Sequence, residues 1–236
     1  MASYTIYPSN ARGTTNYGWL HTRHSFSFGD YYDPKQLHFG ALRVLNDDML
    51  APSKGFGMHP HSNMEIVTLP LEGQIEHKDN MGNAGIIGPG EVQIMSAGTG
   101  VFHSEYNASK SNTLKLLQIW IVPQLANVQP RYAQGSYTLN NNSICNIVSP
   151  PHTESELWIH QQAWLSMGMF DKGERITYQF NKKEQQCLYL FVIKGSILLD
   201  GHTLALRDAI GISNATSIDI ESLSDTQFLL IEVPVL

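Results

Sequence analysis

Short runs of apolar residues, some continuous and some alternating with polar residues, extend over most of the chain. Glycine, asparagine, aspartate and proline interrupt these runs at close spacing. Runs of this length between frequent turn residues are typical of the strands of a β-sandwich or barrel. The predicted strands include residues 41–45, 65–69, 92–95, 114–122, 188–193, 196–199 and 228–233. No convincing helical pattern precedes residue 150, and residues 161–167 are as compatible with a strand as with a short helix.

Two parts of the chain resemble each other, which predicts two copies of one β-unit. Residues 71–75 resemble residues 193–197 at an offset of 122. Residues 94–99 resemble residues 211–216 at an offset of 117, and a hairpin loop can absorb the difference.

A stretch rich in turn-forming residues separates the two copies. Residues 123–151 contain several prolines, a glycine and three consecutive asparagines, which favour turns or a linker. We therefore expect an N-terminal domain over residues 1–130 and a C-terminal domain over residues 131–236.

Charge and composition narrow the function classes. The 236 residues carry a formal net charge of −6, without any run of lysine or arginine. This argues against direct binding of nucleic acid, whose affinity depends on clustered cations. We find no signal-peptide pattern and no apolar stretch of the roughly 20 residues that cross a bilayer, so no membrane association is expected. Cys145 and Cys187 form no CxxC pair, and a reducing cytoplasm is the expected location.

Two segments carry the residues with metal chemistry. His59 and His61 are two positions apart, so on a strand both imidazoles project from the same face. His103 and Glu105 repeat this spacing. Two neighbouring strands of this kind would bring four ligands together inside a barrel. Such a set suits Fe, Mn, Co, Ni, Cu or Zn and leaves open positions on an octahedral ion, whereas structural zinc sites more often use cysteine.

The internal repeat tests whether these residues merely serve the fold. At the offset of 122, the counterparts of His59, His61 and Glu65 are Asn181, Lys183 and Cys187. At the offset of 117, the counterparts of His103 and Glu105 are Ile220 and Ser222. The second copy has no comparable ligand set, so a functional role in the first copy is favoured.

Several other residues near the predicted site have open roles. Glu65 follows His61 by four positions, which on one strand would place it on the same face. It could replace Glu105 as a ligand or accept a hydrogen bond from a ligand histidine. The pocket walls could come from Phe56, Met58, Met95 and Phe102, although a place in the barrel core is at least an equal explanation for each. No role is assigned to His77, His152, His160 and His202.

The sequence resembles the pirins of the cupin superfamily, specifically the bacterial quercetin 2,3-dioxygenase type. The segments that carry the resemblance are residues 24–28, 31–34, 42–48, 59–65, 93–100, 103–107, 118–121 and 130–132. The resemblance implies an all-β bicupin, in which two jelly-roll (double-stranded β-helix) barrels pack together and only the N-terminal barrel binds metal. It also implies that His59, His61, His103 and Glu105 hold one divalent ion, and it favours Glu105 over Glu65. Fe(II) is the favoured metal, with Cu, Ni, Mn, Co and Zn as alternatives.

The function implied by this resemblance is cleavage of the heterocyclic ring of quercetin or a related flavonol by O2, with release of carbon monoxide. The metal would lower the pKa of the bound hydroxyl, and Glu105 would be the catalytic base. One alternative is a redox-responsive regulatory protein that binds a protein partner without physiological enzyme activity. Another is a metal enzyme with a different substrate. All three share fold and ligands, so the resemblance does not separate them.

Overall fold

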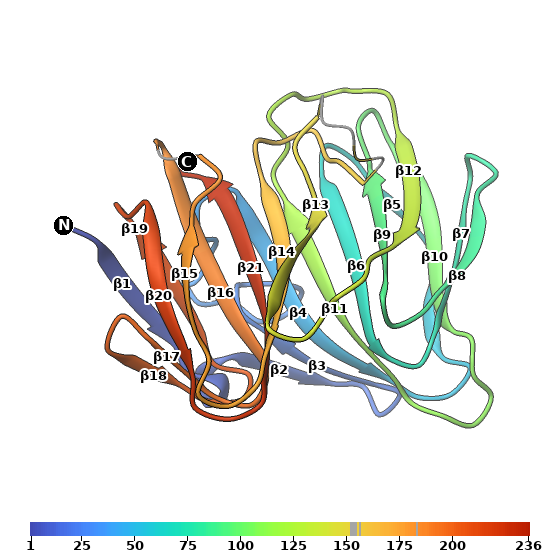
Figure 1. The fold of residues 1–236 in the computed structure, drawn as a ribbon. Helices are drawn as coiled ribbons and strands as arrows, with labels where there is room; N and C mark the ends of the chain where they lie inside the picture. Colours follow the sequence, from blue (N-terminus) through green and yellow to red (C-terminus); the bar gives the residue numbers. More distant parts are fainter. Residues whose placement is uncertain (152–154, 156, 183) are drawn as a thin grey trace.

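The computed structural model describes residues 1–151, 155, 157–182 and 184–236, and these residues fold into two β-sandwich lobes (Figure 1). No α-helix occurs among them, and one 3-10 turn, η1, covers Ser9–Ala11. In the described part of the chain, no helix is long and apolar enough to cross a membrane. The predicted all-β arrangement of two jelly rolls is confirmed, although the sheets of each lobe do not close into barrels.

The N-terminal lobe pairs a large sheet with a small one. The seven-stranded sheet has the order β12 (Arg131–Ser136), β9 (Glu91–Ser96), β6 (Glu65–Glu72), β11 (Leu114–Ile121), β4 (Leu42–Leu50), β3 (Leu20–His24) and β2 (Gly13–Asn16). The four-stranded sheet has the order β5 (Gly55–His61), β10 (Val101–Asn107), β7 (Ile75–Asp79) and β8 (Ala84–Ile87).

The C-terminal lobe repeats this plan. Its six-stranded sheet has the order β1 (Ser3–Tyr7), β19 (Ala209–Ser213), β16 (Gln186–Lys194), β21 (Thr226–Pro234), β14 (Trp164–Phe170) and β13 (Ser143–Val148). Its four-stranded sheet has the order β15 (Arg175–Gln179), β20 (Ser217–Ser222), β17 (Ile197–Leu199) and β18 (His202–Leu204). The ambiguous segment 161–167 therefore leads into strand β14 and is not a helix.

The two large sheets share one hydrophobic core between the lobes. Leu45 and Val67 from the N-terminal lobe belong to the same cluster as Tyr189, Phe191 and Leu229 from the C-terminal lobe. Side chains alternate along a strand, so one face of each large sheet packs against the other lobe and the opposite face lines the interior of its own lobe. In the N-terminal lobe, that interior holds the candidate site.

Two strands belong to the lobe on the other side of the predicted boundary near residue 130. Strand β1 pairs with β19 in the C-terminal lobe, and β12 pairs with β9 in the N-terminal lobe. Figure 1 shows β1 beside β19, within the C-terminal lobe. Each lobe therefore contains one strand from the other side of the division between residues 130 and 131. That division stays a prediction of where the first structural repeat ends.

The strand pairs also correct part of the repeat alignment. His59 pairs with His103, and the corresponding pair in the C-terminal lobe is Ile176 with Ile220. The counterpart of His59 is therefore Ile176 and not Asn181, because the connection from β15 to β16 is longer than that from β5 to β6. Lys183, the predicted counterpart of His61, lies outside the described residues. The position that matches His61 in the strand pairing is Tyr178.

Candidate metal centre

Three histidines from two adjacent strands converge inside the N-terminal lobe. Strands β5 and β10 are antiparallel, with His59 directly opposite His103. The ring centroid of His103 lies 4.4 Å from that of His59 and 4.9 Å from that of His61, and the His59 and His61 centroids are 4.8 Å apart. One ring nitrogen from each lies within 4.8 Å of the others, so the three can hold one metal ion.

The hydrogen bonds of these rings leave nitrogen lone pairs free. His59 Nδ1 lies 2.7 Å from the carbonyl oxygen of Gly57, so Nδ1 donates and Nε2 is left as a ligand atom. Both ring nitrogens of His103 are buried without a hydrogen-bond partner among the described residues. A buried polar group without a partner is costly, and a metal bond would remove this cost at one nitrogen.

The surroundings of His61 and His103 favour the neutral form of both imidazoles. Burial, with repulsion from His59, lowers the pKa of His61 to about 4. Burial, with repulsion from the neighbouring histidines, lowers the pKa of His103 to about 2. Neutral imidazole is the form that binds metal. The donor set thus fits a divalent transition metal with three nitrogen ligands.

Glu105 lies next to this triad but is grouped differently. Its carboxylate forms a second buried group with His77 and His103, rather than with His59 and His61. Oε1 accepts hydrogen bonds from Thr68 Oγ1 at 3.0 Å and Gln93 Nε2 at 3.2 Å, and Oε2 accepts one from Gln118 Nε2. Burial raises the pKa of Glu105 to about 7. Three of the four predicted ligands, His59, His61 and His103, therefore converge on one point. The fourth, Glu105, lies beside His103 in the second group.

From the sequence, no role was assigned to His77, and the structure places this residue against the site. It lies on β7, opposite Glu105 of β10. Its Nε2 is 3.3 Å from Asp79 Oδ2, and its ring stacks on Tyr132 at 4.6 Å and lies 5.4 Å from that of His103. The sequence did contain a pattern that could have indicated His77. Ile75, His77 and Asp79 alternate along β7, so His77 and Asp79 lie on the same face as the buried Ile75.

Glu65 does not share a strand face with His61, so that prediction is wrong. His61 ends β5 and Glu65 begins β6, which belongs to the other sheet. The Glu65 carboxylate accepts hydrogen bonds from Ser96 Oγ at 2.7 Å and from the backbone N–H of His160. Burial raises its pKa to about 7. Val67, two positions further on, packs in the core between the lobes, so Glu65 faces that interface.

The three histidines lie in a pocket of about 450 Å³. Its lining residues are Trp19, Phe28, Asn46, Asp48, Gly55, Phe56, Gly57, His59, His61, Ile66, His103, Glu105, Gln118 and Trp120. Aromatic walls are therefore present, but Trp19, Phe28 and Trp120 were missed because they come from distant segments. Trp120 packs edge-to-face on His61, with ring centroids 4.9 Å apart.

Only one of the four predicted wall residues lines this pocket. Met58 and Phe102 point outward and are 58% and 48% exposed, while Met95 is buried in a separate cluster. Phe56 faces inward because β5 bulges: three steps on β5, from His59 to Phe56, match two steps on β10. The bulge breaks the simple alternation that would have turned Phe56 away from the histidines.

A second carboxyl group also reaches the pocket. Asp48 on β4 is buried, and its Oδ1 has no hydrogen-bond partner among the described residues. Burial raises the pKa of Asp48 to about 7. The pocket thus combines the imidazole ligands with two carboxyl groups that can hold or release a proton near neutral pH.

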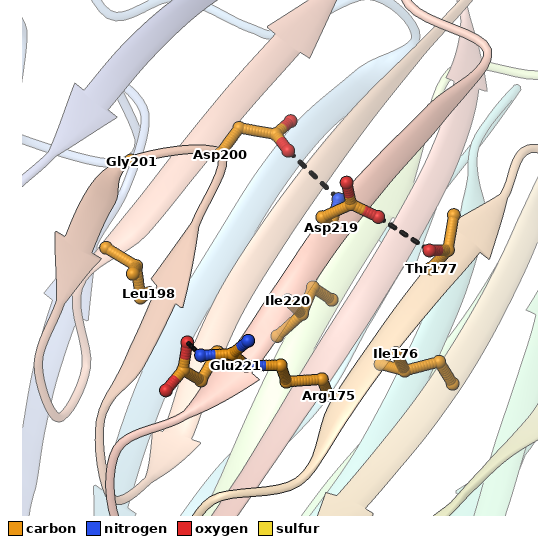
Figure 2. A pocket seen from close by; sticks show the side chains of 9 residues that line it. All are labelled: Arg175, Ile176, Thr177, Leu198, Asp200, Gly201, Asp219, Ile220 and Glu221. Carbon is orange, nitrogen blue, oxygen red and sulfur yellow. Dashed lines mark hydrogen bonds and ion pairs between the residues drawn. The ribbon is translucent and has the colours of Figure 1, made fainter.

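The corresponding part of the C-terminal lobe has different chemistry. Ile176 and Ile220, at the positions of His59 and His103, pack in an apolar core. A pocket of about 490 Å³ lies on the same sheet. Figure 2 shows the Arg175–Glu221 ion pair and the Thr177–Asp219 hydrogen bond among its lining residues. Both metal-ligand groups found in the described part of the chain lie in the N-terminal lobe.

Comparisons with known proteins agree with this architecture. The family model of pirin matches residues 7–121, and that of the quercetinase C-terminal cupin domain matches residues 146–233. The chain is 40% identical over 226 residues to quercetin 2,3-dioxygenase of Escherichia coli K12, covering 96% of both chains. It is 37% identical to a pirin-like protein of Caulobacter vibrioides over 228 residues, covering 95% of this chain and 97% of the relative.

Among solved structures, the bacterial pirin YhhW of Escherichia coli in complex with nickel(II) matches with a TM-score of 0.93 and 38% identity. That alignment covers 99% of this chain and all of the other. Similarity of this extent spans both lobes. The chain belongs to the pirin family of two-domain cupin proteins.

Proposed function

We propose that this protein binds one divalent transition-metal ion through His59, His61 and His103, with Glu105 as the fourth ligand and base. With O2 it cleaves the heterocyclic ring of quercetin or a related flavonol and releases carbon monoxide. The observation that carries the proposal is the convergence of three imidazoles in a 450 Å³ pocket with aromatic walls. The names of the relatives support the same reaction class.

The pocket suits a flat aromatic substrate. Its volume lies within the range of roughly 300–1,000 Å³ typical of small-molecule sites. Two edge-to-face pairs contribute to the walls: Phe28 with Trp120 at 5.3 Å, and Trp19 with Phe56 at 5.5 Å between centroids. Such rings bury a flavonol's apolar faces, while the histidines leave one end of the pocket polar.

The bound metal would act as a Lewis acid that makes the flavonol 3-hydroxyl more acidic. Glu105 is suited to accept that proton, because burial raises its pKa to about 7. Hydrogen bonds from Thr68, Gln93 and Gln118 stabilise and orient its ionised form. Asp48, in the same pocket, is a further group that can hold a proton.

Fe(II) is the metal we propose, since three nitrogens and one oxygen suit it and leave positions open. Copper, nickel, manganese, cobalt and zinc accept similar ligands, and the Escherichia coli relative was solved with nickel(II). The experiment should therefore compare the activity of the protein loaded with each of these metals.

The test is to load the protein with each metal in turn and incubate it with quercetin in air. Oxygen uptake and carbon monoxide release are measured, with a His59→Ala, His61→Ala double variant as control. Metal-dependent carbon monoxide that disappears in the double variant would support the dioxygenase. Stoichiometric metal without turnover would contradict it and favour a regulatory protein. A much larger kcat/KM for another substrate would favour a different metal enzyme.

A further inference from the structure

A third pocket, also of about 490 Å³, lies at the junction of the two lobes and is lined by several basic residues. Its lining includes Arg12, Arg23, Lys115 and Arg207, which are four of the 15 lysines and arginines of the chain. Asp47 is the one acid among the described residues that line the pocket, and Lys115 is already paired with Glu72 at 2.9 Å, so the uncompensated charge belongs to the three arginines. This local excess of positive charge contrasts with the net charge of −6 of the whole chain.

Strand β4 separates this pocket from the metal pocket. Asn46 and Asp48 line the metal pocket, whereas Asp47 and Met49 line the basic one. This division follows the alternation of side chains on a strand. Arg23 is opposite Asp47 on the neighbouring strand β3. The basic pocket is therefore a separate site on the other face of the same sheet.

Several N–H donors of these arginines have no hydrogen-bond acceptor among the described residues. Arg12 is only 6% exposed, and its Nη2 lies 3.6 Å from Asp47 Oδ2. The same oxygen lies 3.4 Å from Nε of Arg207. Among the described residues, Arg12 Nε and Nη1 and Arg207 Nη1 are buried without a hydrogen-bond partner. One carboxylate thus faces two guanidinium groups, and buried donors without partners are costly.

The remaining contacts of these arginines do not supply negative charge. Arg12 and Arg207 lie over the ring of Phe191, at 5.2 and 5.9 Å from its centroid. Burial lowers the pKa of Arg12, and repulsion from Arg207 and Arg23 opposes the effect of Asp47. Arg207 also adopts a φ of +66°, a conformation that favours glycine, in the turn before β19.

We propose that this pocket binds a small dianionic oxyanion, the phosphate group of a phosphate monoester, through Arg12, Arg23 and Arg207. Guanidinium groups bind phosphate oxygens with paired, charge-assisted hydrogen bonds. A dianion would offset the charge excess that Asp47 leaves. Met49 and Leu206 provide apolar surface for the organic part of the ligand. This site is independent of the metal and of the proposed flavonol chemistry.

Isothermal titration calorimetry with inorganic phosphate and glycerol 2-phosphate tests the proposal, at constant ionic strength kept with chloride. We expect saturable binding at one site per chain, with or without metal. Arg23→Gln and Arg207→Gln should each weaken it by about tenfold, because each removes a charged hydrogen-bond donor. Arg175→Gln is the matched control, since Arg175 lies on the small sheet of the C-terminal lobe and pairs with Glu221. Its affinity should equal that of the wild type.

Thermal unfolding in chloride shows whether each variant is folded. Arg23→Lys, which keeps the charge but not the planar donor group, should bind with intermediate affinity. Absence of saturable binding up to about 10 mM of either ligand would overturn the proposal. Equal affinity in wild type, Arg23→Gln and Arg207→Gln would overturn it as well. Either result would leave these arginines with a structural role between the lobes.

Discussion

His59 and His103 face each other across the β5–β10 pair, with ring centroids 4.4 Å apart. Directly opposed residues of an antiparallel pair project to the same face of the sheet. This relationship places the ring of His103 between two groups of ligand atoms, one with His59 and His61 and one with His77 and Glu105.

We expect the metal in the group that contains His61, because His61 lines the open pocket whereas His77 is fully buried and contacts Asp79. His61→Ala should lower metal affinity by at least about 100-fold, through loss of a direct ligand. His77→Ala should keep stoichiometric metal and lose at most about 10–100-fold in affinity, through loss of support around His103. Metal analysis after dialysis measures both. Metal retained in His61→Ala but absent in His77→Ala would place the ion in the other group.

Phe56 and Met58 provide a matched pair on one strand. Phe56 lines the metal pocket, whereas Met58 points to solvent. Phe56→Ala should raise the KM or Kd for quercetin by about tenfold, since aromatic contacts and burial are lost. Met58→Ala should leave it unchanged, and both variants should retain metal. Equal changes in the KM or Kd for quercetin in the two variants would show that Phe56 does not contact the substrate in preference to Met58.

Glu105→Gln should make the metal-free protein more stable at alkaline pH. The pKa of Glu105 is about 7 in the folded protein, against 4.5 for the exposed group. Its contribution to the free energy of unfolding is therefore fully present below pH 4.5 and is lost as pH rises through 7. Glutamine does not titrate. The variant should gain up to about 3 kcal/mol at about pH 8.

Urea unfolding of metal-free wild type and Glu105→Gln across this pH range measures that gain. The difference between the two proteins should shrink steadily as the pH falls toward 4.5. A constant difference would contradict the raised pKa. With metal present, the variant should instead be at a disadvantage, since it lacks an anionic ligand.

Removal of residues 1–7 should weaken the C-terminal lobe although these residues are at the N-terminus. Strand β1 pairs with β19 from Ser3 to Tyr7, and the ring of Tyr7 lies 5.2 Å from that of Tyr189. We expect a loss of about 2–4 kcal/mol and faster hydrogen exchange in β19. Metal stoichiometry should not change. Faster exchange in β5 and β10 with β19 unaffected would contradict this expectation.

The two-residue spacings of His59 with His61 and of His103 with Glu105 were sufficient to predict the faces of their side chains. Alternation is a local property of an extended backbone, so it can be read from the chain. The same locality explains why the all-β class was predictable from short runs between turn residues. It also explains why the second lobe could be predicted to lack the histidine pairs.

Other features depended on contacts between distant segments. Glu65 follows His61 by four residues, but the chain turns at Asn63, which has a φ of +49°, and enters another sheet. Phe56 faces the metal pocket only because of a bulge, and Trp19 reaches it from a different segment. Spacing along the chain contains no information about such arrangements.

Local patterns along the chain were enough to predict the fold class, the internal repeat and the histidines that share a face. Packing between distant segments places His77 beside His103, turns Glu65 toward the other lobe and pairs β1 with β19. Strand alternation is set by the backbone of each residue. Strand partners, bulges and the assignment of strands to sheets are set by packing among residues far apart in the chain.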